Sequence, residues 1–456
     1  QPDAGPMAKK CVSEYRSAVY YHNSQPTFSE RIRVAIPDKS EDLYAVFVFS
    51  HCSSKASKTN AFAFAFMKLG TRLESISSTI RSKEGAYTVV RDGVHHLTLY
   101  KALPGMDVGE FNLAFIDRGA DKTLLRRKDT FSVSTMLTST VRTQNKSLAL
   151  AIDFANGALE CNKPIAFEGG SAAAGDVGRL GKVLNDLSYF LSDRNHSVTY
   201  LRRILDSVFI MLVKVKHAET KKHVFSILVD FLKLISKTLM NGAYASLLDI
   251  YLDDIFRNAK GNENVHATIV DQASRIVAER VKELKDPQAS LDKKKQLVGV
   301  QSFVKSSSTI LADMMRCFSY IVRFAIASTE IASARDAQGK FKESLQHLMH
   351  YIDLLMTKNT SIVLQNIILQ NFTPAFTALS SVFDESELGE LARGFIVSVP
   401  NETDPGRCLT NVYKLLLVHS LLSSTDTETT IFKNDTSRRV RWSASAPMVH
   451  CAAFPS

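Results

Sequence analysis

The residues that could form a phosphate-binding loop lie in one glycine-rich stretch, Gly175, Gly178 and Gly181 followed by Lys182. Backbone amides at closely spaced glycines can surround phosphate oxygens, and a lysine after them can contact the same oxygens. A nucleotide-binding loop of this kind also requires Ser or Thr directly after the lysine, where Val183 stands, and a strand before the first glycine. The stretch is therefore interpreted as a flexible connector.

Other arrangements of reactive residues are no more complete. His95 and His96 are adjacent, so on a strand their side chains point to opposite faces and cannot hold one metal ion together. Neither a Gly-x-Ser-x-Gly elbow nor a His-Glu-x-x-His pair occurs. The sequence predicts a chain that is not an enzyme and that binds no metal or cofactor.

The cysteines give the same indication. They are scattered without a Cys-x-x-Cys pair, which argues against zinc and against a disulfide framework and favours reduced thiols in a cytoplasmic protein. The six positions are Cys11, Cys52, Cys161, Cys317, Cys408 and Cys451.

Composition and charge define the broad class of protein. The chain has 456 residues, 45% of them hydrophobic and 22% charged, which is sufficient for two or three domains that each have a core. The net charge of +10 favours acidic partners in general, but the lysines are spread over segments with helical patterning. No nucleic acid partner is therefore expected. No apolar run approaches the ~20 residues needed to cross a bilayer, so any membrane contact is expected to be peripheral.

The first hundred residues have the period of β-strands. Ala61 to Phe66 alternates alanine with phenylalanine, which places Phe62, Phe64 and Phe66 on one face, expected to be core. Six such runs suggest a partial antiparallel β-sandwich whose opening strands precede Gln1. The expected strands are Ser17 to Tyr21, Arg31 to Ile36, Leu43 to Phe49, Ala61 to Met67, Tyr87 to Val90 and Leu97 to Tyr100.

The pattern then changes to the period of helices. From Pro104 to Gly181 it is weak, and Glu168 to Gly181 is expected to be a flexible connector. Beyond it, apolar stripes such as Leu201 to Leu212, Val224 to Ile235 and Leu345 to Met356 predict successive antiparallel helices. An armadillo-like α-helical repeat scaffold fits this succession, and so does an irregular bundle.

These patterns divide the chain into four parts. The expected fold class is multidomain, β then α. The expected boundaries are 1–118 for the antiparallel β-sandwich, 119–182 for a connector with the first helices, 183–423 for the helical scaffold and 424–456 for a disordered tail.

A binding site is expected at one end of the sandwich, where loops gather on a rigid scaffold. Because antiparallel strands reverse direction, the loops His22 to Glu30 and Ser50 to Asn60 are expected at one end and Pro37 to Asp42 at the other. Lys55 and Lys58 then lie on a rim without the Asp ligands that calcium requires. They either bind phosphorylated inositol head groups as point charges or are solvated loop lysines.

Several segments resemble the DOCK (dedicator of cytokinesis) family. Ser13 to Pro26, with Tyr-His-Asn before a strand, is similar to its C2-like region, and so are Arg31 to Pro37, Phe49 to Lys55 and Ala61 to Phe66. Phe131 to Asn145 resembles the segment just beyond that region, and the nearest match in style is the Rac-activating subgroup. The chain is thus similar to the later part of the C2-like region and the start of the helical scaffold.

The resemblance implies a guanine-nucleotide exchange factor that activates Rac-type GTPases through a separate domain, of which residues 181–456 show no sign. It also implies recruitment from the cytoplasm to plasma membranes containing phosphatidylinositol 3,4,5-trisphosphate, and an ELMO-type adaptor as partner of the full-length parent. Lys55 and Lys58 become candidate head-group ligands. The family's pocket also uses a basic loop that would precede Gln1, so the pocket is expected to be incomplete here. The alternative is a stand-alone helical-repeat adaptor that binds proteins without lipid.

Overall fold

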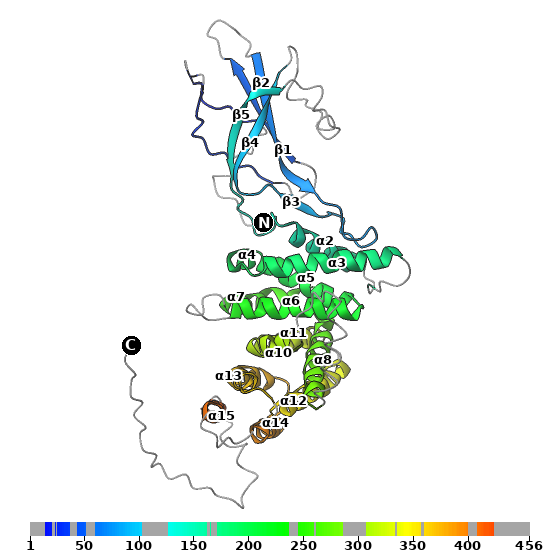
Figure 1. The fold of residues 1–456 in the computed structure, drawn as a ribbon. Helices are drawn as coiled ribbons and strands as arrows, with labels where there is room; N and C mark the ends of the chain where they lie inside the picture. The colour runs from blue at the N-terminus through cyan, green and yellow to red at the C-terminus, as the bar shows by residue number, and fades with distance from the viewer. Residues whose placement is uncertain are drawn as a thin grey trace, which may run out of the picture. The chain divides into compact units, whose positions relative to one another are not determined.

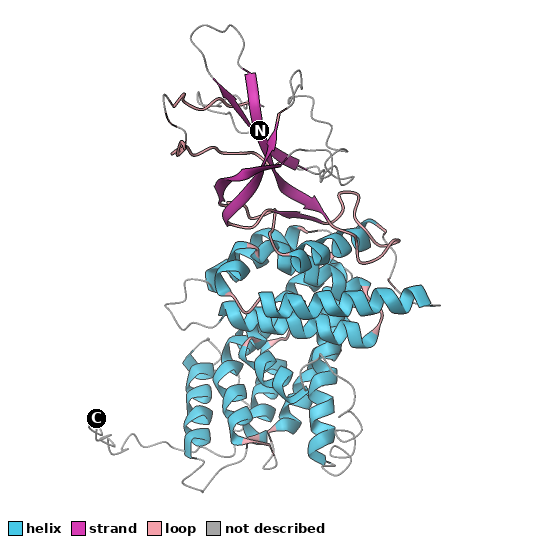
Figure 2. Ribbon diagram, turned by 45° about the horizontal axis from the view of Figure 1, so that its top comes forward, coloured by secondary structure: helices cyan, strands magenta, loops and turns pink. Residues whose placement is uncertain are grey.

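The computed structural model divides the chain into two units, which Figures 1 and 2 show as ribbons. One unit comprises residues 1–74 and 84–149, and the other comprises residues 75–83 and 150–456. The described residues are 14–20, 23, 25–36, 43–51, 60–102, 126–161, 165, 171–236, 245–259, 261–285, 307–332, 335–356, 360–399 and 408–423.

The first unit is built on one antiparallel sheet. Its order is β1-β2-β4-β5, and β3 pairs with the far end of β2. The strands are β1 (Leu43–His51), β2 (Asn60–Arg72), β3 (Tyr87–Val89), β4 (Gly93–Lys101) and β5 (Arg126–Thr135). The prediction of a partial antiparallel C2-like β region ahead of helices is confirmed.

The alanines of β2 allow this sheet to curl. Ala63 and Ala65 pair with Phe49 and Phe47 of β1, so all four side chains share one face. Because alanine is small, the rings of Phe47 and Phe49 reach Phe131 of β5, with ring centroids 5.1 and 5.0 Å apart. Strands β2 and β4 separate β1 from β5 in the sheet, so these ring contacts close its concave face into a half-barrel.

The phenylalanines of β2 occupy the opposite face. Phe64 is fully buried and stacks on Tyr100 of β4, and Phe66 stacks on the same ring, each at 5.5 Å between centroids. The prediction that this face belongs to the core is confirmed for Phe64. The alanine face is also buried at Ala63 and Ala65 because aromatic rings from β1 and β5 cover it.

Two expected strands do not form. Residues 17–20 and 31–36 lie outside any strand, so the predictions of Ser17 to Tyr21 and Arg31 to Ile36 were wrong for the described residues. The amide of Ala18 donates to the Glu30 carboxylate at 3.1 Å, and so a side chain takes a donor that a strand ladder would have used. Alternating apolar residues without a paired neighbour are insufficient for a strand.

The second unit is a stack of helices, which confirms the predicted helical scaffold. Helix α5 packs on α6, α6 on α10, α10 and α11 on α13, and α13 on α15, while α8 packs on α12 and α12 on α14 (Figure 1). The helices are α2 (Lys146–Glu160), α3 (Ser171–Phe190), α4 (Arg194–Thr199), α5 (Leu201–Lys214), α6 (Ala218–Ser236), α7 (Ala245–Ile250), α8 (Val265–Lys285), α10 (Ser307–Arg316), α11 (Phe318–Ala332), α12 (Arg335–Leu355), α13 (Ile362–Leu379), α14 (Glu385–Ser398) and α15 (Cys408–Ser423). Among the described residues, no helix is long and apolar enough to cross a membrane.

A π-helical turn shapes the core of this stack. The turn spans Tyr251–Ile255 and leads into a 3₁₀ turn at Phe256–Asn258. Residues five apart on an ideal α-helix differ by about 140° in direction, whereas the wider turn aligns them more closely. Tyr251 and Phe256 can therefore both join Phe209 and Phe324, with ring centroids between 4.9 and 6.5 Å apart.

The loop Ser75–Lys83 belongs to the helical unit, although its sequence lies between β2 and β3. The backbone amide and the hydroxyl of Ser82 both donate to the buried Asp153 carboxylate of α2, at 3.0 and 2.7 Å. A Cβ at Gly157 would lie 2.5 Å from the carbonyl carbon of Arg81. Glycine at this position therefore allows the loop to lie directly on α2.

Residues 171–181, expected to be part of a flexible connector, lie instead in helix α3. Three glycines, at 175, 178 and 181, lie within the helix, where each costs roughly 1 kcal/mol relative to alanine. Leu180, Leu184 and Leu187 are buried, and their packing provides the stabilisation that the glycines do not. The glycine content therefore misled the prediction.

The Gly178→Ala variant is expected to raise the free energy of unfolding of the helical unit by about 0.5–1 kcal/mol. A Cβ at this position meets no atom within 4 Å, so the gain in helix propensity carries no steric cost. Thermal unfolding followed by circular dichroism measures the change. Gly157→Ala is the matched control, because the same added methyl group would clash with the backbone of Arg81 and lower the melting temperature.

Candidate functional site

The candidate head-group ligands Lys55 and Lys58 lie outside the described residues, in the segment 52–59 between β1 and β2. The two strands pair up to the edge of this segment, with His51 opposite Asn60. The His51 ring stacks on Phe62 at 4.3 Å between centroids. The residues that flank this segment, His51 and Asn60, therefore lie paired at one defined end of the sheet.

Further basic residues occur at the same end. Ala63 of β2 pairs with Lys101, the last residue of β4, and Tyr100 pairs with Arg126, the first residue of β5. Strand β5 continues with Arg127 and Lys128. We call Lys101 and residues 126–128 the cationic sheet end. The strand pairings therefore bring several basic residues of β4 and β5 to one end of the sheet, an arrangement suited to a polyanion in a salt-dependent manner.

Sequence reasoning missed the cationic sheet end because it did not recognise β5. The useful signal was the basic run at 126–128 directly before the alternating Phe131 and Val133. The expected position of the loop His22 to Glu30 at this end depended on flanking strands that do not form in the described residues. The loop Pro37 to Asp42 lies outside the described residues.

The adjacent histidines of β4 make separate cross-strand contacts. The Nε2 atom of His95 lies 2.9 Å from the Thr135 hydroxyl, and the Nδ1 atom of His96 lies 2.8 Å from the Ser132 hydroxyl. Consecutive positions on the strand direct the two rings to opposite faces. Within the described ranges, no group of three or more His, Cys, Asp or Glu residues could hold a metal ion.

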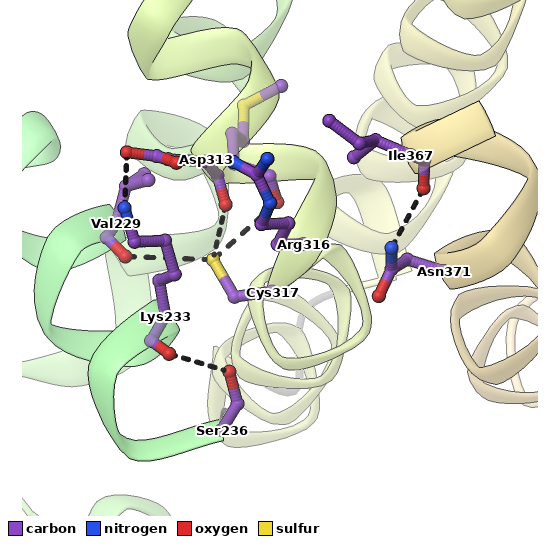
Figure 3. Close-up of polar contacts among 9 residues, drawn as sticks. Val229, Lys233, Ser236, Asp313, Arg316, Cys317, Ile367 and Asn371 are labelled. Atoms are coloured by element: carbon purple, nitrogen blue, oxygen red, sulfur yellow. Dashed lines mark hydrogen bonds and ion pairs between the residues drawn. The ribbon is translucent and has the colours of Figure 1, made fainter. Parts of the chain in front are cut away.

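A group of buried polar contacts joins α6 to α10 in the helical unit (Figure 3). We call its residues Lys233, Asp313, Arg316 and Cys317 the polar lock. The buried Asp313 carboxylate accepts from Lys233 Nζ and from Arg316, both at 2.6 Å. The thiol of Cys317 donates to the Val229 carbonyl at 3.8 Å, and burial raises the pKa of this thiol. A thiol that remains protonated is a poor nucleophile, so the lock is structural.

The two units define a class of protein: a C2-like β domain with a basic end, combined with a helical-repeat region. Two family profiles match the chain, the C2 domain in Dock180 and Zizimin proteins at residues 4–147 and the dedicator of cytokinesis (DOCK) TPR region at residues 294–448. The chain belongs to the dedicator of cytokinesis family.

Individual relatives are similar along most of the chain. Dedicator of cytokinesis protein 3 of Homo sapiens is 24% identical over 96% of the chain, and dedicator of cytokinesis protein 4 of Mus musculus is 22% identical over 85% of it. These matches cover 20% and 17% of the two relatives, so the chain spans about a fifth of their length. No solved structure matches the chain significantly.

Proposed function

We propose that this chain is the membrane-targeting and scaffold segment of a guanine-nucleotide exchange factor that activates Rac-type small GTPases. The match of residues 4–147 to the family's C2 domain carries the proposal, because it includes the segment with Lys55 and Lys58. In this proposal the two lysines bind the phosphates of phosphatidylinositol 3,4,5-trisphosphate. The cationic sheet end adds to the attraction for the anionic surface.

The division of labour between the two units follows from their chemistry. Point charges at the end of a rigid sheet can recruit a cytoplasmic protein peripherally to the plasma membrane without inserting into the bilayer. Stacked helices form a long, stiff element that can space and orient an exchange domain and bind an ELMO-type adaptor. Exchange on the GTPase belongs, in this proposal, to a part of the parent protein beyond the two matched regions.

Sedimentation with liposomes tests the lipid-binding part of the proposal. The Lys55→Ala/Lys58→Ala variant is expected to bind vesicles containing phosphatidylinositol 3,4,5-trisphosphate about 30-fold more weakly at low salt, since each lysine near an anionic surface contributes ~1 kcal/mol. Raising the salt concentration should reduce wild-type binding as well. The matched control is Lys282→Ala/Lys285→Ala, which removes two exposed lysines from α8 and should leave binding unchanged.

The second candidate function is a helical-repeat adaptor that binds proteins without lipid, favoured by the large share of the chain in stacked helices. Equal binding of the wild type to all vesicles, or to none, would support this alternative and contradict phosphoinositide recognition. An Arg126→Ala/Arg127→Ala variant then separates the two groups of charges. A loss of binding in this variant alone would assign recognition to the cationic sheet end and remove the role of Lys55 and Lys58.

A further inference from the structure

Helix α15 has one buried face and one exposed apolar face. Leu417 is buried, and the Thr410 hydroxyl bonds to Asn366 of α13 at 3.0 Å, so this side lies against the stack. Val412, Leu415 and Leu416 are 48%, 65% and 56% exposed. Their spacing of three and four residues places them together on the opposite side of the helix. We call these three residues the outer face of α15.

The outer face is unusual within the stack. Helix α13, one step earlier, packs on α11 on one side and on α15 on the other. A helix of a repeat stack buries an apolar stripe against each neighbour, and an uncovered stripe of large residues marks a contact surface. In the described residues, α15 has its principal packing partner, α13, on one side only.

We propose that residues 424–448 of the same chain dock on the outer face of α15. The match to the DOCK helical region covers residues 294–448, so it includes α15 and continues past its last residue, Ser423, into this segment. The segment carries several large apolar side chains, among them Ile431, Phe432 and Trp442. It therefore offers apolar anchors to an apolar face within the same family region.

Chain connectivity favours this occupant over a second copy or a foreign helix. The segment begins at the residue after α15, and a directly tethered segment has an effective concentration in the millimolar range. The polarity of the segment alone predicted a disordered tail. The exposed leucines of α15 and the extent of the family match favour docking instead, because leucine side chains gain from leaving water.

Trp442 provides a direct test, because it is the only tryptophan in the chain. Docking predicts that its fluorescence in the full 456-residue chain is shifted to shorter wavelength than that of free tryptophan and is protected from acrylamide. The Leu415→Asp/Leu416→Asp variant is expected to shift the emission to longer wavelength. Trypsin should also cut this variant after Lys433 and Arg438 at least about tenfold faster, since cleavage follows the population of the open state.

Val397→Asp is the matched control, because Val397 is 76% exposed on α14 and the change likewise places a charge on an apolar surface residue. It should leave the fluorescence and the cleavage rate unchanged. Far-UV circular dichroism and the melting temperature of each variant establish that the stack is intact.

Two results would overturn the proposal. One is wild-type Trp442 with the emission and quenching of free tryptophan, which needs no variant to be folded. The other is a wild-type dimer that Leu415→Asp/Leu416→Asp dissociates while trypsin cleavage after Lys433 stays unchanged. That outcome would assign the outer face to a second copy of the chain.

Discussion

Replacing Asp313 by alanine is expected to lower the free energy of unfolding of the helical unit by about 3–5 kcal/mol. The Asp313 carboxylate is 7% exposed and is the shared acceptor of Lys233 from α6 and Arg316 from α10. Its removal would leave Lys233, whose side chain is only 24% exposed, without this counter-charge between two packed helices. The lost attraction is large because both charges are already removed from most of the solvent.

Urea titration followed by circular dichroism measures the loss. Asp271→Ala is the matched control: Asp271 pairs with Arg275 at 2.9 Å within α8, but the two side chains are 47% and 62% exposed. This exposed pair should contribute only about 0.3–0.5 kcal/mol. An Asp313→Ala variant no less stable than Asp271→Ala would show that the polar lock does not hold α6 to α10.

Segments in which the buried residues recur with the period of the strand or helix that forms could be predicted from the sequence. The alanine–phenylalanine alternation of β2 predicted a strand with a buried Phe64, and the apolar stripe from Leu201 to Leu212 predicted α5. In both segments the buried residues recur with the period of the element that forms. Local pattern and tertiary packing agree there, so the pattern was sufficient.

Segments stabilised mainly by distant partners could not be predicted. The glycines of α3 suggested a connector, yet Leu184 of this helix is buried and α3 packs on α6, which the local pattern of residues 171–181 does not indicate. Conversely, Ile32 and Val34 alternate as in a strand and remain exposed without a paired neighbour. The candidate site shares this limitation, because Arg126 joins the end where β1 meets β2 only through the pairing of β5 with β4.

Asp353 gives the helical unit a pH-dependent stability. Burial raises the pKa of this α12 carboxyl to about 6, and its Oδ1 atom is buried with no hydrogen-bond partner among the described residues. The backbone of α14 faces the carboxylate, since a Cβ at Gly394 would lie 3.9 Å from Asp353 Oδ2. Packing against α14 therefore contributes to keeping water away from a charge that prefers to be solvated.

Because the folded state holds the Asp353 proton more tightly than the unfolded state, stability is expected to fall as pH rises from about 4 to about 6. Above this range the ionised carboxylate costs less than the ~3 kcal/mol that a shift of roughly two pKa units alone would give, because the side chain is only partly buried and solvent screens its charge. Asp353→Asn is therefore expected to stabilise the unit at pH 7 and to have little effect at pH 4. Urea titrations of wild type and variant at both pH values measure this difference.

Glu343→Gln, at an exposed position of the same helix, removes one carboxylate without changing burial and should behave like the wild type at both pH values. If Asp353→Asn gave the same change in stability at pH 4 as at pH 7, the carboxyl would not titrate between them in the folded state. The change in stability on Asp353→Asn would then come from the shape of the side chain at the α12–α14 contact. A gain confined to neutral pH would instead identify the buried charge as its cause, because only the ionised form has lost solvation there.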